Sequence, residues 1–145
     1  MPSAEHSVVV HRPRSEVFAF IADGENAQQW RPAVLDIRRE RGEGVGAVYR
    51  QGVRGPFGRR VAADYEVTAL EPDRSLAFRA IAGPVRPEGR YELADLDGAT
   101  RVTFRLEYEP RGAAKLMSPM VAKSMQSEVR SLENLRRVLE QRGSA

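Results

Sequence analysis

The chain has 145 residues and no cysteine, a length that suits one domain and a composition that excludes disulfides, thiolate metal sites and a cysteine nucleophile. Its net charge is +3, with 20 acidic residues mixed among 23 basic ones, and a glutamate interrupts its densest basic cluster, Arg38-Arg39-Glu40-Arg41. Nucleic-acid binding normally needs clustered basic residues with interleaved aromatics, so no nucleic-acid partner is expected.

No segment has the composition of a signal peptide or a membrane span. The residues up to His11 contain only the short apolar run Val8-Val9-Val10. No stretch approaches the roughly 18 apolar residues that a membrane span needs. We therefore expect a cytoplasmic protein with no membrane span, and the sequence leaves open whether it forms a homodimer.

The first part of the chain predicts one strand followed by two short helices. The valines of 7–11 are typical of a strand. Pro13 suits the first turn of a helix, because its missing N–H needs no partner there, and the helical apolar spacing continues to Ala22. A second short helix is expected over 25–30, and Pro32 ends it.

The middle of the chain predicts six strands, because turn signals rich in glycine and proline separate short runs of alternating polarity. The expected strands are 34–40, 47–54, 60–70, 75–81, 89–96 and 100–109. The dipeptide Asp97-Gly98 between the last two predicts a two-residue type I′ hairpin turn.

Counting outwards from three of these turns places one set of side chains on one face of the sheet. The count puts Tyr91 opposite Phe104, Phe78 opposite Tyr91, and Val67 opposite Phe78. The other residues expected on this face are Tyr65, Ala69, Leu76, Ala80, Gly89, Leu93, Val102 and Leu106. The sheet is therefore expected to have one face that is almost entirely apolar, which needs a cover.

The segment 113–141 supplies that cover as one long helix. Its apolar residues recur at helical spacing, and Pro119 must lie in its first turns. The opposite face of the sheet pairs Glu66 with Arg79, as expected for a solvated face. These features predict an α+β fold in which a curved antiparallel sheet of about seven strands wraps the long helix and encloses an apolar cavity.

Several motifs fall at the turns and core positions of this predicted fold. They are Pro13-Arg14-Ser15-Glu16-Val17-Phe18-Ala19-Phe20-Ile21-Ala22-Asp23 with Trp30-Arg31-Pro32, Gly44-Val45-Gly46-Ala47-Val48-Tyr49, Tyr65-Glu66-Val67-Thr68 with Glu71-Pro72, Leu76-Ala77-Phe78-Arg79, and Gly98-Ala99-Thr100-Arg101-Val102-Thr103-Phe104. With these motifs the chain resembles the START-like or Bet v 1-like (SRPBCC) superfamily of helix-grip folds, and within it the polyketide cyclase/dehydrase branch. The resemblance implies that 1–145 form a single START-like ligand-binding domain.

The superfamily houses several functions on one scaffold, so the resemblance leaves three hypotheses. The first is binding, transport or sequestration of a small hydrophobic molecule such as a lipid, polyketide or aromatic metabolite. The second is an enzyme of the cyclase/dehydrase type, in which polar groups guide aldol closure and water loss. The third is a module whose sheet edge or helix contacts a partner protein or the ribosome, which a large exposed apolar patch would support.

Three residues are candidates for acid–base chemistry. Glu128 lies near the centre of the apolar stripe of the terminal helix, and a carboxyl group in an apolar interior can serve as an acid or base. Alternatively, Glu128 reaches solvent or an arginine. Tyr65 and Tyr91 are expected to point inward, where their hydroxyls either bind a ligand carbonyl or satisfy each other or the backbone.

The candidate ligand-binding residues are side chains expected to face the cavity. They are Trp30, Tyr49, Gln51, Tyr65, Phe78, Tyr91, Phe104, Met117, Met120 and Val121. Trp30 either stacks on a ligand or anchors the packing, and Gln51 either orients a ligand or lies at the cavity mouth.

No metal site is expected, because His6 and His11 lie on opposite faces of one strand. No cofactor is expected, because the sequence has no phosphate loop and no dinucleotide fingerprint.

Overall fold

The computed structural model describes residues 3–83, 85–109 and 118–142. The first elements are the strand β1 (Ser3–Val10), the helix α1 (Arg14–Ala22) and the 3-10 helix η1 (Gly24–Gln29). Pro13 precedes α1, and the carboxylate of Asp23 accepts a hydrogen bond from the backbone N–H of Glu25 at the start of η1. The expected order of one strand and two short helices is therefore confirmed.

The remaining strands continue in one antiparallel sheet. They are β2 (Val34–Arg41), β3 (Val48–Arg54), β4 (Arg60–Ala62), β5 (Tyr65–Glu71), β6 (Ser75–Ala80), β7 (Glu88–Leu96) and β8 (Ala99–Glu107), with the short 3-10 helix η2 (Pro56–Gly58) between β3 and β4. Their order is β1-β8-β7-β6-β5-β3-β2, and β4 pairs with β3. The expected strand 60–70 is divided into β4 and β5, and between them the carboxylate of Asp64 accepts the backbone N–H of Gln51 at 3.2 Å.

The turn at Asp97-Gly98 fixes the register of the β7–β8 hairpin. Both residues have positive φ, 53° and 91°, as a type I′ turn requires. Tyr91 consequently lies opposite Phe104, as the sequence predicts. This hairpin places two aromatic side chains side by side on the inner face of the sheet.

The predicted register of β6 against β7 is wrong by two residues. Phe78 lies opposite Gly89, and Leu76 lies opposite Tyr91. The pairing continues closer to the turn than expected, since the backbone N–H of Ala80 donates to the carbonyl of Pro87 at 3.0 Å. A shift of two residues leaves every side chain on its expected face, because the side-chain period of a strand is two.

A bulge in β5 changes the face of one residue. Val67 lies opposite Phe78 as predicted, but the register then shifts so that Leu70, in place of Ala69, lies opposite Leu76. Leu70 packs against the core, whereas Ala69 is exposed. The prediction of an inward Ala69 is therefore wrong, because one extra residue in a strand reverses the alternation.

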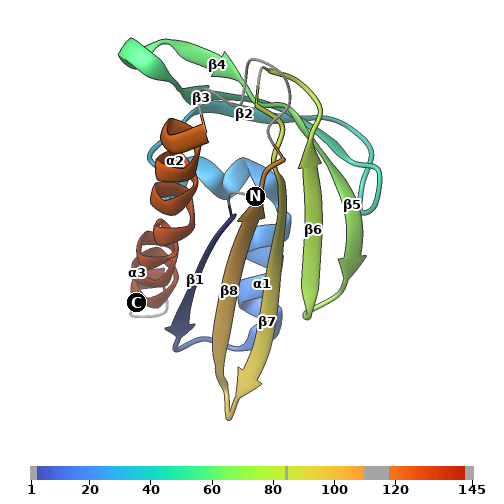
Figure 1. Ribbon diagram of the computed structural model, residues 1–145. Coiled ribbons are helices and arrows are strands. Elements are labelled where there is room, and N and C mark those ends of the chain that lie inside the picture. The colour runs from blue at the N-terminus through green and yellow to red at the C-terminus, as the bar shows by residue number, and fades with distance from the viewer. Residues whose placement is uncertain (1–2, 84, 110–117, 143–145) are drawn as a thin grey trace.

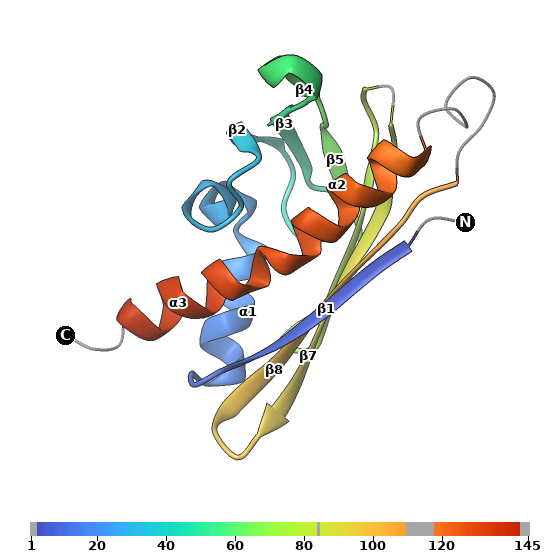
Figure 2. The ribbon, with the colours of Figure 1, turned by 60° about the vertical axis from the view of Figure 1, so that its left-hand side comes forward.

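The C-terminal helix lies across the concave side of the sheet in two segments, α2 (Ser118–Arg130) and α3 (Leu132–Arg142) (Figures 1 and 2). The break falls at Ser131, whose hydroxyl and backbone N–H both bond to the carbonyl of Glu128. The predicted helix over 113–141 is therefore interrupted once, and its first five residues lie outside the described ranges. Pro119 lies in the first turn of α2, as expected.

The core forms between this helix and the apolar face of the sheet. The largest fully buried side chains are Val10, Val17, Thr100, Val102, Phe104, Val129, Leu132, Leu135 and Leu139. The helix α1 fills the concave side next to β7 and β8 (Figure 1). Across the described parts of the chain, no helix combines the length and apolarity needed to cross a membrane.

Candidate functional site

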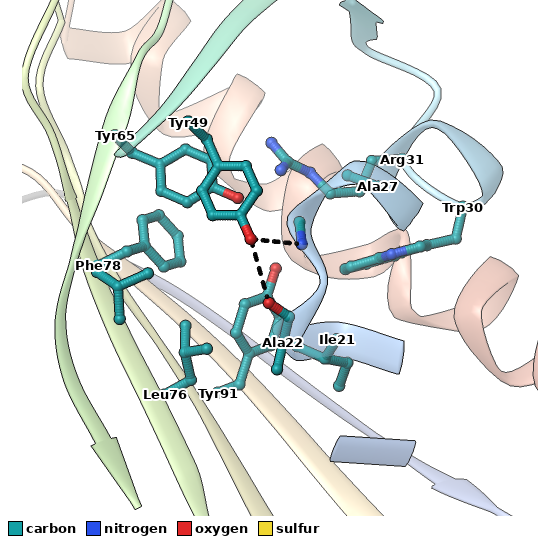
Figure 3. A pocket seen from close by; sticks show the side chains of 12 residues that line it. Ile21, Ala22, Ala27, Trp30, Arg31, Tyr49, Tyr65, Leu76, Phe78 and Tyr91 are labelled. Atoms are coloured by element: carbon teal, nitrogen blue, oxygen red, sulfur yellow. Dashed lines mark hydrogen bonds between the residues drawn. The ribbon is translucent and has the colours of Figure 1, made fainter. Parts of the chain in front are cut away.

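A pocket lies between the α1–η1 segment and the strands β3, β5, β6 and β7 (Figure 3). The twelve residues that line it are Ile21, Ala22, Gly24, Ala27, Trp30, Arg31, Tyr49, Tyr65, Val67, Leu76, Phe78 and Tyr91. Its free volume is about 20 Å³, enough for roughly one water molecule. Pockets for organic ligands usually measure roughly 300–1,000 Å³, so the pocket in this structure is too small for one.

The sheet side of the pocket is a continuous row of aromatic rings. Tyr49 stacks on Tyr65 with ring centroids 5.1 Å apart, and Tyr65 lies 5.2 Å from Phe78. Phe78 lies 6.0 Å from Tyr91, which in turn stacks on Phe104 at 4.3 Å. Aromatic rows of this kind offer a planar apolar surface with hydroxyl groups at its rim.

The helical side of the pocket approaches this row closely at Gly24. The backbone N–H of Gly24 donates to the hydroxyl of Tyr49 at 3.3 Å, and that hydroxyl donates to the carbonyl of Ala22 at 3.4 Å (Figure 3). A Cβ at position 24 would lie 2.3 Å from the hydroxyl oxygen of Tyr65. Glycine is therefore required at this position for lack of space.

Trp30 closes the pocket at the end of η1. It is buried, and its ring meets the edges of Tyr91 at 6.2 Å and Phe104 at 6.4 Å. The side-chain amide of Asn134 donates to the carbonyl of Trp30 at 3.1 Å and so ties this wall to α3. Trp30 is thus both a wall of the pocket and an anchor of the packing.

A largely buried ion pair lies at the polar end of the pocket. The Nε of Arg31 donates to Oε2 of Glu128 at 2.8 Å, and the two side chains are 11% and 18% exposed. The Nη1 of Arg31 donates to Oε1 of Gln51 at 3.1 Å, and the Nε2 of Gln51 donates to the carbonyl of Ala63 at 3.0 Å. The guanidinium is therefore held in one orientation by groups from β3 and α2.

The charge of Arg31 is maintained by its partner. Burial disfavours a charged group and on its own lowers the pKa of the Arg31 guanidinium, whereas the carboxylate of Glu128 raises it, and the resulting pKa lies above its usual range. Arg31 therefore presents a fixed positive charge beside an apolar wall. Of the alternatives for Glu128, the structure shows the carboxylate bound to an arginine.

The hydroxyls of Tyr65 and Tyr91 point into the space in front of Arg31 (Figure 3). Burial raises the pKa of both hydroxyls above their usual range, and the charge of Arg31 opposes that rise. Within the described ranges neither hydroxyl has a hydrogen-bond partner, and no fully buried side-chain polar atom is left unsatisfied. Both hydroxyls therefore remain accessible from the pocket. Because their pKa values are raised, both are protonated at neutral pH.

The structure brings five of the predicted ligand-binding residues to the pocket lining and places the others elsewhere. The five are Trp30, Tyr49, Tyr65, Phe78 and Tyr91. Gln51 and Phe104 lie immediately behind the lining, and Val121 is buried in the core. Met120 is 54% exposed, because it lies on the outer side of α2 next to the inward Val121, and Met117 lies outside the described residues.

Among the twelve described residues that line the pocket, Arg31 is the one charged residue, and the sequence does not predict it as a site residue. Arg31 belongs to the Trp30-Arg31-Pro32 motif, and its partner is 97 positions away in the chain. The available signal was Glu128 itself, since a carboxylate in an apolar helical stripe requires a cation or a donor to compensate its burial. The Trp30-Arg31-Pro32 motif offers such a cation next to a buried ring.

Solved structures share the fold over nearly the whole chain. A protein from Thermus thermophilus is 22% identical with a TM-score of 0.83, and the match covers 99% of this chain and 100% of that one. The Zhui aromatase/cyclase from a Streptomyces species is 23% identical with a TM-score of 0.72, covering 94% of each chain. A START superfamily protein from Mycobacterium smegmatis is 19% identical with a TM-score of 0.71, covering 97% of this chain and 95% of that one.

Two sequence comparisons complete the assignment. No curated protein matches the chain significantly in sequence. The family model described as polyketide cyclase/dehydrase and lipid transport matches residues 1–140. The helix-grip architecture and this match agree with the resemblance identified from the motifs. The chain therefore belongs to the polyketide cyclase/dehydrase and lipid transport family.

Proposed function

We propose that the protein binds a small, largely apolar molecule, such as a lipid, polyketide or aromatic metabolite, in the pocket between η1 and the sheet. The observation that carries the proposal is the pair of hydroxyls, Tyr65 and Tyr91, that reach an aromatic pocket without a partner in the described part of the chain. Polar groups in protein interiors are nearly always hydrogen-bonded. Two open hydroxyls in an apolar wall suit a site whose ligand supplies the missing partner.

Ligand entry requires the pocket to open, because about 20 Å³ cannot hold an organic molecule. The 3-10 helix η1 is the part of the lining best suited to move, since 3-10 hydrogen bonds have poorer geometry than those of an α-helix. Two contacts join the end of η1 to the terminal helix, Arg31 with Glu128 and Asn134 with the carbonyl of Trp30. We infer that these contacts loosen when a ligand enters.

The direct test is native mass spectrometry of the purified protein, followed by extraction of any bound molecule. We expect an apolar compound at near-stoichiometric occupancy, or binding of a member of a panel of lipids and aromatic compounds. Trp30 is the only tryptophan and lines the pocket, so its emission should change on titration.

The variant Trp30→Phe is the control for this titration. It should lose the optical change while calorimetry still records binding. The proposal fails if nothing co-purifies and no compound of the panel alters Trp30 emission or raises the melting temperature.

A second candidate, a cyclase/dehydrase-type enzyme, is favoured by the convergence of Arg31 with the hydroxyls of Tyr65 and Tyr91 (Figure 3). Donors of this kind polarise a ketone carbonyl, which eases both enol formation and aldol closure. Incubation with a poly-β-ketone and mass analysis of the products distinguishes the two. A carrier returns the compound unchanged, whereas an enzyme releases a cyclised product lighter by the mass of water.

A further inference from the structure

The polar side chains of the pocket are all able to donate hydrogen bonds. They are Arg31, Tyr65, Tyr91 and Tyr49, whose proton already goes to the carbonyl of Ala22, and none of the twelve lining residues is acidic. Glu128 lies behind Arg31 and outside the lining. A guanidinium donates and cannot accept, and a tyrosine hydroxyl has a proton to give. The pocket therefore matches a ligand whose polar atoms are acceptors.

Arg31 has donor capacity left after its internal contacts. Its Nε binds Glu128 and one Nη1 bond goes to Gln51, whereas Nη2 has no hydrogen bond to any described residue. A guanidinium carries five N–H donors in a fixed planar fork. Because two of its nitrogens are already held, the remaining donors are pre-oriented and lose little conformational freedom when a ligand binds.

We propose that Arg31 is the specificity-determining residue of the pocket, donating to an acceptor oxygen on the ligand together with Tyr65 and Tyr91. The ligand class is an aromatic molecule bearing a ketone carbonyl or a carboxylate. Glu128 is a positioning residue, which fixes the orientation of the guanidinium and balances its positive charge while the pocket is empty. This inference rests on the proposed function, since it names the ligand chemistry of the same site.

Three probes of nearly equal shape test the assignment by calorimetry: 2-acetylnaphthalene, 2-naphthoate and 2-ethylnaphthalene. The first offers a ketone oxygen, the second a carboxylate, and the third no acceptor. We expect the first two to bind about tenfold more tightly than the third, as hydrogen bonds to a charged donor imply. The ratio between ketone and carboxylate then identifies which oxygen the site prefers.

Variants then assign this preference to Arg31. The double variant Arg31→Gln/Glu128→Gln removes both charges together, so no unpaired charge is left buried. It should bind 2-ethylnaphthalene as before and lose the preference for the acceptor probes. The matched control is Arg60→Gln/Asp36→Asn, which removes an exposed ion pair of the same 2.8 Å length outside the pocket. This control should keep the full preference.

A second pair of variants separates positioning from mere structural support. Glu128→Gln retains an acceptor for the Nε of Arg31 and should keep the preference, whereas Glu128→Met should reduce it. The inference is overturned if the native protein binds the three probes equally, or if the preference survives in the Arg31 double variant. In both cases the proposed function stands. Failure of all three probes to bind overturns the inference too, whereas the proposed function is tested separately by native mass spectrometry and the ligand panel.

Discussion

Arg31 and Glu128 meet across 97 positions of sequence and carry opposite charges in a largely apolar setting. Removing both charges from such a pair often costs little, because desolvation offsets the attraction between them. Removing one leaves the other buried without a counter-ion. The pair is therefore expected to contribute to the specificity of the pocket more than to the stability of the fold.

The first prediction tests this expectation. Arg31→Met should lower the free energy of unfolding by about 3 kcal/mol, because Glu128 stays largely buried without its partner. Arg31→Met/Glu128→Leu should recover most of that loss. Urea unfolding of the native protein, both single variants and the double variant measures the coupling. A double variant as unstable as the single one would show that the ion pair itself stabilises the fold.

The aromatic residues of the pocket lining could be predicted from the sequence, whereas the charged residue Arg31 could not. The rings of Tyr65, Phe78 and Tyr91 could be placed because strand alternation fixes which face each occupies. Arg31 could not, because its role depends on the packing of η1 against α2, and no local pattern encodes that contact. The position of Glu128 in an apolar stripe indicated that a partner was needed without identifying it.

At the scale of elements, η1 and the sheet are separated by almost no space. A Cβ on Gly24 would lie 2.3 Å from the hydroxyl oxygen of Tyr65 and 2.7 Å from the ring of Tyr49. Such distances are below van der Waals contact, so one of the two elements would have to shift. The fit of η1 against β3 and β5 therefore sets the size of the pocket.

The second prediction concerns Gly24→Ala, which should lower the free energy of unfolding by about 2 kcal/mol through overpacking. Tyr65→Phe in the same chain should restore part of the loss, since it removes the nearest atom and leaves the contact with Tyr49. Tyr65→Phe alone is the control and should be close to neutral. Thermal unfolding of the four proteins measures both effects, and an undiminished stability of Gly24→Ala would mean that η1 moves freely.

The strand registers could be predicted where a turn has a defined chemistry. Asp97-Gly98 specifies a two-residue turn, and the register of β7 against β8 followed from it. The connection from Ala80 to Glu88 carries no such signal, so its length was misjudged. The bulge after Val67 has no sequence marker, which is why Ala69 was placed on the wrong face.

At the scale of the whole molecule, the buried tyrosines of the pocket make the free energy of unfolding depend on pH in the alkaline range. Burial raises the pKa of Tyr65 and of Tyr91 in the folded state, whereas the unfolded chain ionises near the ordinary tyrosine pKa of about 10. The folded state therefore keeps these protons at a pH where the unfolded state releases them. Their contribution to stability is complete below about pH 10 and is lost progressively above it.

The third prediction follows from this loss of stability at alkaline pH. The midpoint of urea unfolding should begin to fall near about pH 10, where unfolded tyrosine ionises, and should fall more steeply as the pH rises further. Tyr65→Phe/Tyr91→Phe should flatten that fall. The control is Tyr108→Phe, which removes a tyrosine that is buried in the core and lies outside the pocket lining. If the double variant retains the same steep fall, the alkaline loss originates elsewhere.

The order of the sheet leaves β2 at one edge, where η1 packs beside it, and β1 at the other edge, where α2 and α3 pack. The cluster Arg38-Arg39-Glu40-Arg41, too interrupted to suggest a nucleic-acid surface, falls in β2, and all four residues are exposed. Along this edge the backbone N–H of Arg39 donates to the carboxylate of Glu25 at 3.1 Å, and the carbonyl of Leu35 accepts from the side chain of Gln28 at 2.8 Å. Charged side chains on an edge strand further deter pairing with a strand of another molecule. Substitutions that make this edge apolar are therefore expected to lower the solubility of the protein before they affect its pocket.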